Sequence, residues 1–195
     1  MKVIVASHNE GKIKEFHSIL EPLGFEVLKA SDFNVDVSMI EETGTTFAEN
    51  ALIKAKAVYE IIKLPVVSDD SGLNLDAFPE LLGVYSARFM ENEPYHIKNK
   101  TILKKYETES NRKANFESCV VYYDGHAHSF SGIVEGEIVD KIKGEGGFGY
   151  DPIFKPSGYS QTFGEMSVID KDKISHRARA LNKFVEFIKE ESNER

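Results

Sequence analysis

The chain has 195 residues, 41% of them hydrophobic, and its 24 basic and 32 acidic residues give a formal net charge of −8 at pH 7. This length can bury one sizeable core, and no apolar run approaches the roughly 18 residues that a membrane-spanning helix needs. The negative charge disfavours non-specific binding along nucleic acid, whereas a small phosphate ligand would need local cations and a divalent metal held by carboxylates.

The first third of the chain predicts two strand–helix units. Residues 3–6 form a β-branched run, a polar loop follows at residues 7–12, and apolar side chains then recur at helical spacing as far as residue 23. Residues 25–30 alternate as a second strand does. Beyond another polar loop, Thr46 and Glu49 match a capping box, which predicts a helix that continues to about Lys63.

The middle of the chain predicts a strand that ends in acidic residues. Residues 65–67 open a buried strand that runs into the sequence SDDSG at 68–72, and a short second run follows at 73–78. A helix is expected over residues 94–106, because proline is favoured at a helix start. Charged residues therefore occur where a core strand is expected to end.

The second half predicts a hairpin and a final helix. Strands at 116–123 and 128–139 flank Asp124-Gly125, a dipeptide that favours a tight turn. The last helix is expected from about Ser175. Strand–helix units followed by a meander indicate an α/β protein with a mixed sheet and helices on both faces.

The loop of residues 7–12 is the first candidate site. It lies between a strand and a helix, where backbone N–H groups and the helix dipole attract an anion. It lacks the glycines and the GK[ST] ending of a Walker loop, so a capped helix start is the alternative interpretation. Lys12 and Lys14 lie in the first helical turns, where a cation is unfavourable unless an anion is bound. The presence of two lysines at this unfavourable position therefore favours an anion site.

Two pairs of carboxylates form the second candidate, a site for a hard cation. Glu41 and Glu42 lie in the polar loop, and Asp69 and Asp70 follow the buried strand. Successive side chains of an extended segment point to opposite faces, so one acid of each pair is expected to face the site. The spacing does not decide which one, and solvated acids on ordinary turns are the alternative.

The glycine-rich sequence at residues 144–149 is the third candidate. It matches G-x-G-x-x-G, but an apolar run with Pro152 follows where a dinucleotide-binding fold needs a helix, so that fold is rejected. The remaining interpretation is a loop that presents Phe148 for stacking on a nucleobase, with Asp151 beyond it. The alternative is that Phe148 is a core residue.

The sequence Ser175-His176-Arg177, with Lys171 shortly before it, is the fourth candidate. Ser175 is expected to cap the last helix, which places His176 and Arg177 in a first turn that disfavours cations without a ligand. Arg177 offers a planar fork for a phosphate or for the oxo edge of a base.

Three other patterns are weaker. His126 and His128 share a strand face, but they flank a turn and no third metal ligand is evident. Ser71 lacks the surroundings of a nucleophilic serine. Cys119 is the single cysteine, so it cannot form an intramolecular disulfide, and a reducing cytoplasm is the compartment that fits.

Seven segments together give the sequence a specific family resemblance. They are SHNEGK at 7–12, EETG at 41–44, FAENA at 47–51, SDDSGL at 68–73, GVYSARF at 83–89, GGFGYDPIF at 146–154 and SHRARAL at 175–181. In these segments the chain resembles the inosine triphosphate pyrophosphatase, or HAM1-like, family over nearly its whole length. The resemblance implies a single domain over residues 1–195, with a long twisted mixed β-sheet, flanking helices and two lobes around a central cleft. It also implies a homodimer.

The resemblance further implies the role of each site residue. The triphosphate-binding loop would be Ser7, His8, Asn9, Glu10, Gly11 and Lys12. Glu41 and Asp70 would hold Mg²⁺, and Asp70 would also be the base that activates water. The other substrate contacts would be Ser71, Phe148, Gly149, Tyr150, Asp151, Lys171, His176 and Arg177. His8 departs from the family pattern, which usually has a small or amide residue at this position.

The implied reaction is Mg²⁺-dependent hydrolysis of ITP, dITP or XTP to the monophosphate and pyrophosphate, which clears non-standard purines from the nucleotide pool. We hypothesise that water activated by Asp70 attacks the α-phosphorus, while Mg²⁺ and Lys12 neutralise the developing charge. A broader nucleotide pyrophosphatase, such as the Maf group, and a non-catalytic nucleotide-binding module are the alternatives. No nucleic acid polymer and no membrane is expected as a partner.

Overall fold

The computed structural model describes residues 1–193, which divide into two compact units. Unit 1 comprises residues 1–70, residues 118–132 and the residues from His176 onward, and unit 2 comprises residues 71–117 and 133–175. The chain therefore changes unit within three strands, β3 (Val66–Leu75), β4 (Lys113–Tyr123) and β5 (Ala127–Ile138).

One mixed sheet contains all the strands of the described residues, in the order β2-β1-β3-β4-β5-β6. Strand β1 (Lys2–Val5) pairs in parallel with both β2 (Glu26–Lys29) and β3, and β5 pairs antiparallel with β6 (Phe154–Pro156). Strands β4 and β5 are neighbours joined by residues 124–126, where the hairpin turn was predicted. The predicted α/β fold with a mixed sheet is confirmed.

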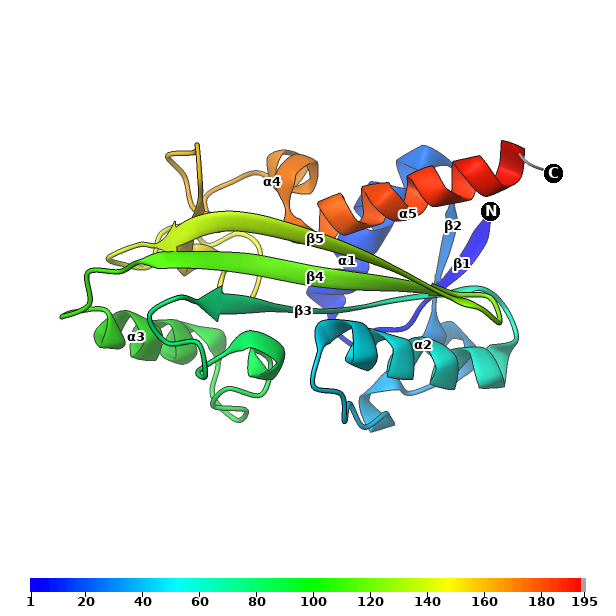
Figure 1. Ribbon diagram of the computed structural model, residues 1–195, viewed down its shortest axis with the longest axis horizontal. Coiled ribbons are helices and arrows are strands. Elements are labelled where there is room, and N and C mark those ends of the chain that lie inside the picture. The colour runs from blue at the N-terminus through cyan, green and yellow to red at the C-terminus, as the bar shows by residue number, and fades with distance from the viewer. Residues whose placement is uncertain (194–195) are drawn as a thin grey trace. The chain divides into compact units, whose positions relative to one another are not determined.

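Helices cover both faces of the strands in unit 1. Helix α2 (Phe47–Ile62) lies on one side, and α1 (Glu10–Leu20) and α5 (His176–Asn193) lie on the other (Figure 1). The predicted capping box starts α2, because Thr46 Oγ1 accepts from Glu49 N at 3.1 Å and the Glu49 carboxylate accepts from Thr46 N at 3.2 Å. Helix α1 is followed by a 3-10 turn (Glu21–Leu23), which ends at Gly24.

The core of unit 1 lies between the sheet and the helices α1 and α5. Apolar residues recur along both helices at helical spacing, so each presents one apolar stripe to the strands. The core consists of Val3, Val5, Ile13, Phe16, Leu20, Phe25, Val27, Val67, Val120, Tyr122, Ala180, Leu181, Phe184 and Val185.

Unit 2 contains α3 (Tyr95–Lys105), α4 (Val168–Ile174) and β6. Helix α3 begins after Pro94, as the sequence predicted. Helix α4 was not predicted; it has seven residues, and Ser167 caps it by accepting from Asp170 N. A short segment of this kind contains too few apolar positions for a helical period to be recognised.

One prediction about the strands was wrong. The acidic pair Asp69 and Asp70 does not follow a strand but lies within β3, which continues for ten residues from Val66 to Leu75. The strand continues because each carboxylate finds polar partners on its own face, so neither is buried without a hydrogen bond. In the polar loop before α2, two 3-10 turns form, at Ala30–Phe33 and Val37–Met39.

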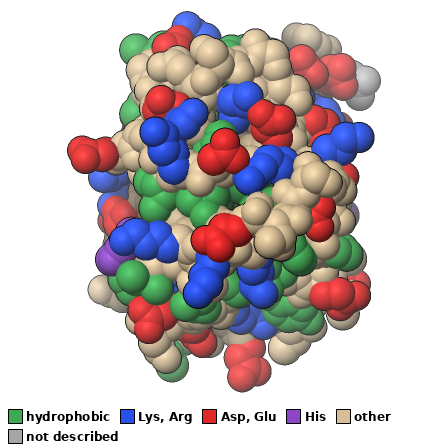
Figure 2. Space-filling model, turned by 90° about the vertical axis from the view of Figure 1, so that its left-hand side faces the viewer, with side chains coloured by type: hydrophobic (Ala, Val, Ile, Leu, Met, Phe, Trp, Pro, Cys, Tyr) green, Lys and Arg blue, Asp and Glu red, His purple; other side chains and the backbone are tan. Residues whose placement is uncertain are grey.

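The charges on one face of the molecule are mixed in sign. Figure 2 shows the face at the left of Figure 1, where Lys and Arg side chains are interspersed with Asp and Glu and neither forms a continuous patch. In the described residues, no helix combines the length and the apolar character that a membrane span requires.

Candidate functional site

The loop of residues 7–12 connects β1 to α1 in unit 1, as the sequence predicted. Asn9 is the N-cap of α1, with its Oδ1 accepting from Lys12 N at 3.0 Å, and Ser7 Oγ accepts from Asn9 N at 3.1 Å. His8 and Glu10 are exposed at this helix start. The capped helix start considered as an alternative is therefore present, and the anion site stays a prediction.

Lys12 has an acidic partner inside the protein. Its Nζ lies 3.4 Å from Asp69 Oδ2. Burial lowers the pKa of Lys12, and the neighbouring Asp69 opposes this change. The unfavourable position of this cation in the first turn of α1 is thus compensated by a carboxylate on β3, which the sequence alone did not reveal.

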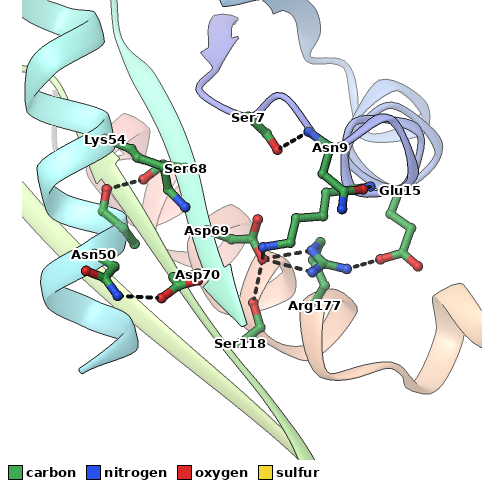
Figure 3. A network of polar contacts seen from close by, with 12 residues as sticks. Ser7, Asn9, Glu15, Asn50, Lys54, Ser68, Asp69, Asp70, Ser118 and Arg177 are labelled. Atoms are coloured by element: carbon green, nitrogen blue, oxygen red, sulfur yellow. Dashed lines mark hydrogen bonds and ion pairs between the residues drawn. The ribbon is translucent and has the colours of Figure 1, made fainter. Parts of the chain in front are cut away.

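Asp69 belongs to a buried ionic network on the face of β3 that carries α1 and α5 (Figure 3). The fully buried Arg177 donates to Asp69 Oδ2 through Nη2 at 2.9 Å and Nε at 3.1 Å, and its Nη1 donates to Glu15. Ser118 Oγ lies 3.4 Å from the same oxygen. Burial opposes ionisation of Asp69, but Arg177 and then Lys12 outweigh it and hold the pKa of this carboxyl well below its usual range.

Asp70 points to the opposite face of β3, toward α2 (Figure 3). Its Oδ2 accepts from Nδ2 of the fully buried Asn50 at 3.0 Å. Burial raises the pKa of Asp70, Glu42 adds to the increase, and Lys12 and Lys54 act against it. A buried carboxylate with a raised pKa in a polar setting is typical of a catalytic base.

The structure distinguishes the two glutamates of the acidic loop. Glu42 Oε2 lies 3.1 Å from Lys54 Nζ, and Glu42 is close enough to Asp70 to raise its pKa. Glu41 is exposed. The geometry therefore brings Glu42 and Lys54 to the Asp70 face, and the assignment of Glu41 as a metal ligand stays a prediction.

A divalent cation would depend on few protein ligands at this site. Within residues 1–193, no three His, Cys, Asp or Glu side chains are grouped so that they could hold a metal ion. Mg²⁺ is commonly held by one or two carboxylates together with water and substrate phosphates. The hard oxygens of Asp70 and of a glutamate from residues 41–42 fit that requirement.

A separate group of predicted residues, around the aromatic ring of Phe148, lies in unit 2. Lys171 Nζ lies 2.6 Å from Asp151 Oδ2 and 4.7 Å from the centre of the Phe148 ring, and Phe148 N donates to the same Asp151 oxygen at 2.8 Å. Gly147 has a φ of +67°, and a Cβ there would collide with the Asp151 carboxylate. Three predicted residues, Phe148, Asp151 and Lys171, are thus brought into contact.

The other predicted residues differ in accessibility. The Tyr150 side chain is buried and its hydroxyl donates to Ser86 O at 2.5 Å. His176 and Arg177 begin α5 as predicted, but both side chains are buried. Gly149 and Ser71 are partly exposed, in unit 2.

Three residues with polar contacts at this site were missed by the sequence interpretation: Glu15, Asn50 and Lys54. All are buried on helices whose neighbouring positions form the apolar stripe. The signal that could have found them is the four-residue spacing of Asn50 and Lys54, which places two polar side chains on one side of α2 next to Ala51 and Ala55.

Comparison with known proteins reveals full-length relatives. The model of the Ham1 family matches residues 3–187. A dITP/XTP pyrophosphatase of Aquifex aeolicus is 43% identical over 200 residues, covering 97% of each chain, and one of Agrobacterium fabrum is 44% identical over 203 residues, covering 94% of each. The solved structure of a HAM1 protein from Coxiella burnetii matches with a TM-score of 0.86 at 34% identity, over 97% of this chain and 99% of that one. The predicted family resemblance is confirmed.

Proposed function

The chain belongs to the Ham1 family, and on that basis we propose that it hydrolyses non-standard purine nucleoside triphosphates to the monophosphate and pyrophosphate. The substrates would be ITP, dITP and XTP. The observation that carries this proposal is the setting of Asp70, a buried carboxylate with a raised pKa, near the cations Lys12 and Lys54.

In the proposed reaction Asp70 accepts the proton of the water that attacks the α-phosphorus. A pKa above the usual aspartate value makes its carboxylate a stronger base. The ammonium groups of the partly buried Lys12 and the buried Lys54 stabilise the negative charge that develops on the phosphate oxygens. Pyrophosphate leaves as the phosphorus–oxygen bond breaks.

We propose that the reaction requires Mg²⁺, held by Asp70 and by a glutamate of the acidic loop. The family resemblance favours Glu41, and the contacts of Glu42 make it the second candidate. When bound, Mg²⁺ would supply positive charge to the phosphate oxygens.

Purine selection would depend on Phe148 and on hydrogen-bond donors near it. An aromatic face stacks on a nucleobase for about 1–3 kcal/mol. A donor such as Lys171, whose Nζ lies over the Phe148 ring, would favour a 6-oxo group over the 6-amino group of adenine, because an amino group presents a hydrogen where an acceptor is needed. Guanine also has a 6-oxo group, so its rejection would depend on the 2-position.

We also propose that the protein works as a homodimer in a reducing cytoplasm. The dimer is suggested by the family resemblance, and the compartment by the presence of only one cysteine, the buried Cys119. Light scattering on the purified protein would measure the mass against the 21.9 kDa of one chain.

The test of the proposed function is pyrophosphate release from ITP, dITP, XTP, GTP, ATP and dTTP, with Mg²⁺ and with EDTA. Wild type is compared with Asp70→Asn and with the control Asp140→Asn, whose exposed carboxylate pairs with Arg112 at 2.9 Å. We expect Mg²⁺-dependent release from ITP, dITP and XTP, a loss of roughly 10²- to 10⁴-fold in Asp70→Asn, and no loss in the control.

Each alternative has a distinct outcome in the same assay. Equal rates on all six nucleotides would keep the pyrophosphatase chemistry but refute purine selection. Nucleotide binding without pyrophosphate release would identify a binding module. An Asp70→Asn enzyme that keeps most of its turnover would show that Asp70 is not the base.

A further inference from the structure

Asn50 is a buried polar residue whose position calls for an explanation. It lies in the first turn of α2 with none of its surface exposed, beside the apolar positions Phe47 and Ala51. Burying a polar amide costs free energy unless its hydrogen bonds are replaced within the protein. An apolar residue would pack there without that cost, so the amide is expected to have a specific task.

Both ends of the Asn50 side chain are used. Its Nδ2 donates to Asp70 Oδ2 at 3.0 Å (Figure 3). Its Oδ1 accepts from Gly44 N at 2.8 Å. The two partners determine the orientation of the amide, because the reversed side chain would set oxygen against a carboxylate and NH₂ against an N–H group. Asn50 therefore joins the acidic loop to strand β3 in one defined geometry.

Gly44 makes this link possible. A Cβ at Gly44 would lie 2.7 Å from Asn50 Oδ1 and 2.6 Å from Glu49 Cβ, so any larger residue would push the loop away. The loop is also held by Glu49, whose Oε2 accepts from Thr45 N at 2.6 Å. The segment that follows Glu41 and Glu42 is thus fixed to α2, and through Asn50 it is connected to Asp70.

We propose that Asn50 is a positioning residue, which sets the orientation of the Asp70 carboxylate and its distance from the loop of Glu41 and Glu42. This inference rests on the proposed function, in which Asp70 is the base and both segments supply metal ligands. Residues that orient metal ligands through hydrogen bonds change metal affinity or activity by roughly 10- to 100-fold when they are replaced.

The test compares Asn50→Ala and Asn50→Asp with wild type. Asn50→Ala removes both hydrogen bonds, and Asn50→Asp keeps the shape but sets a carboxylate against Asp70. For both we expect kcat for ITP to fall roughly 10- to 100-fold. KM should change by less than about threefold, because Asn50 contacts Asp70 and is not one of the proposed nucleotide contacts.

A matched control is available in Ser68→Ala. Ser68 Oγ donates to Ala51 O at 2.6 Å, so it forms a buried hydrogen bond between the same strand and the same helix without touching Asp70. This variant should lose stability but keep the kcat of wild type. If Asn50→Ala fails to fold, Gly44→Ala breaks the same link from the loop side and should lower kcat in the same way.

Two further readouts do not depend on turnover. The first is the affinity for Mn²⁺ alone, measured by electron paramagnetic resonance, which should fall roughly 10- to 100-fold in Asn50→Ala but not in Ser68→Ala. The second is hydrogen exchange of the Gly44 amide, which should be slow in wild type and Ser68→Ala and fast in Asn50→Ala, because its acceptor is lost.

The outcomes separate this inference from the proposed function. A folded Asn50→Ala protein with the kcat and Mn²⁺ affinity of wild type would overturn the positioning role, as would an equal loss of kcat in Ser68→Ala. If wild type releases no pyrophosphate from any nucleotide, the proposed function fails, and the Mn²⁺ affinities alone then decide whether Asn50 orients Asp70.

Discussion

On one face of strand β3 Asp69 meets the cations Arg177 and Lys12, whereas on the other face its neighbour Asp70 meets the neutral amide of Asn50. Both carboxylates are buried. The pKa of Asp69 is held well below its usual range, and the pKa of Asp70 is raised. Two identical residues in adjacent positions thus differ in chemistry because the pleat of the strand directs them to different surroundings.

This difference indicates that Asp69 and Asp70 have different roles. A carboxylate that is paired with a buried guanidinium stabilises the fold only as long as both charges are present, so it is poorly suited to exchange protons. In a buried carboxylate with a raised pKa, burial makes the ionised form less favourable, so this group is better suited to accept a proton. We therefore expect Asp69 to serve mainly stability and Asp70 mainly catalysis.

The largest expected effect on stability is that of Asp69→Asn. It leaves the buried Arg177 and the partly buried Lys12 without their main counter-charge, so the free energy of unfolding should fall by about 3–5 kcal/mol. Urea unfolding measures this loss. As a control, Glu60→Gln breaks the exposed pair with Lys63 and should cost under about 1 kcal/mol. A similarly small loss for Asp69→Asn would show that Asp69 does not stabilise the fold as proposed.

The free energy of unfolding should depend on pH differently in wild type and in Asp69→Asn. Because the folded-state pKa of Asp69 lies below its unfolded value near 3.8, its ionisation stabilises the fold above that value, and the stabilisation is lost as pH falls toward the folded-state pKa. The stability difference between wild type and Asp69→Asn should therefore be constant near neutral pH and shrink below about pH 4. Urea unfolding at a series of pH values measures it; a constant difference at every pH would contradict the assignment.

Glu15→Gln should have an intermediate effect. Arg177 Nη1 would keep a neutral acceptor, and Asp69 would still neutralise most of the guanidinium charge. Hydrogen bonds to charged groups contribute about 1.5–3 kcal/mol, so we expect a loss at the lower end of that range. Thermal unfolding of the single variant and of the double variant with Asp69→Asn would measure the coupling, and strict additivity would argue against one network.

The smallest effect on stability is expected for Asp70→Asn, the variant with the largest expected effect on turnover. Its side chain can still accept the hydrogen bond from Asn50, and the cost of burying a charge is removed. The free energy of unfolding should stay within about 1 kcal/mol of wild type or rise. A loss of stability comparable to that of Asp69→Asn would contradict the different roles assigned to the two aspartates.

Much of the local structure could be predicted from single segments. The capping box at Thr46 and Glu49, the hairpin at residues 124–126 and the start of α5 depend on neighbours within a few residues, and each formed as expected. The continuity of β3 through the two aspartates could not be predicted, because it depends on partners far away in sequence, such as Arg177, which lies 108 residues from Asp69.

The sequence by itself determined the fold class, the family and the candidate residues, because hydrophobic periodicity and ordered motifs are properties of the chain. The tertiary structure alone decided that Asp70 rather than Asp69 faces α2, that Lys12 and Arg177 are neutralised by buried carboxylates, and that Asn50 joins the acidic loop to Asp70. Charge, burial and hydrogen bonding at a residue depend on which distant segments pack against it, and no spacing along the chain contains that information.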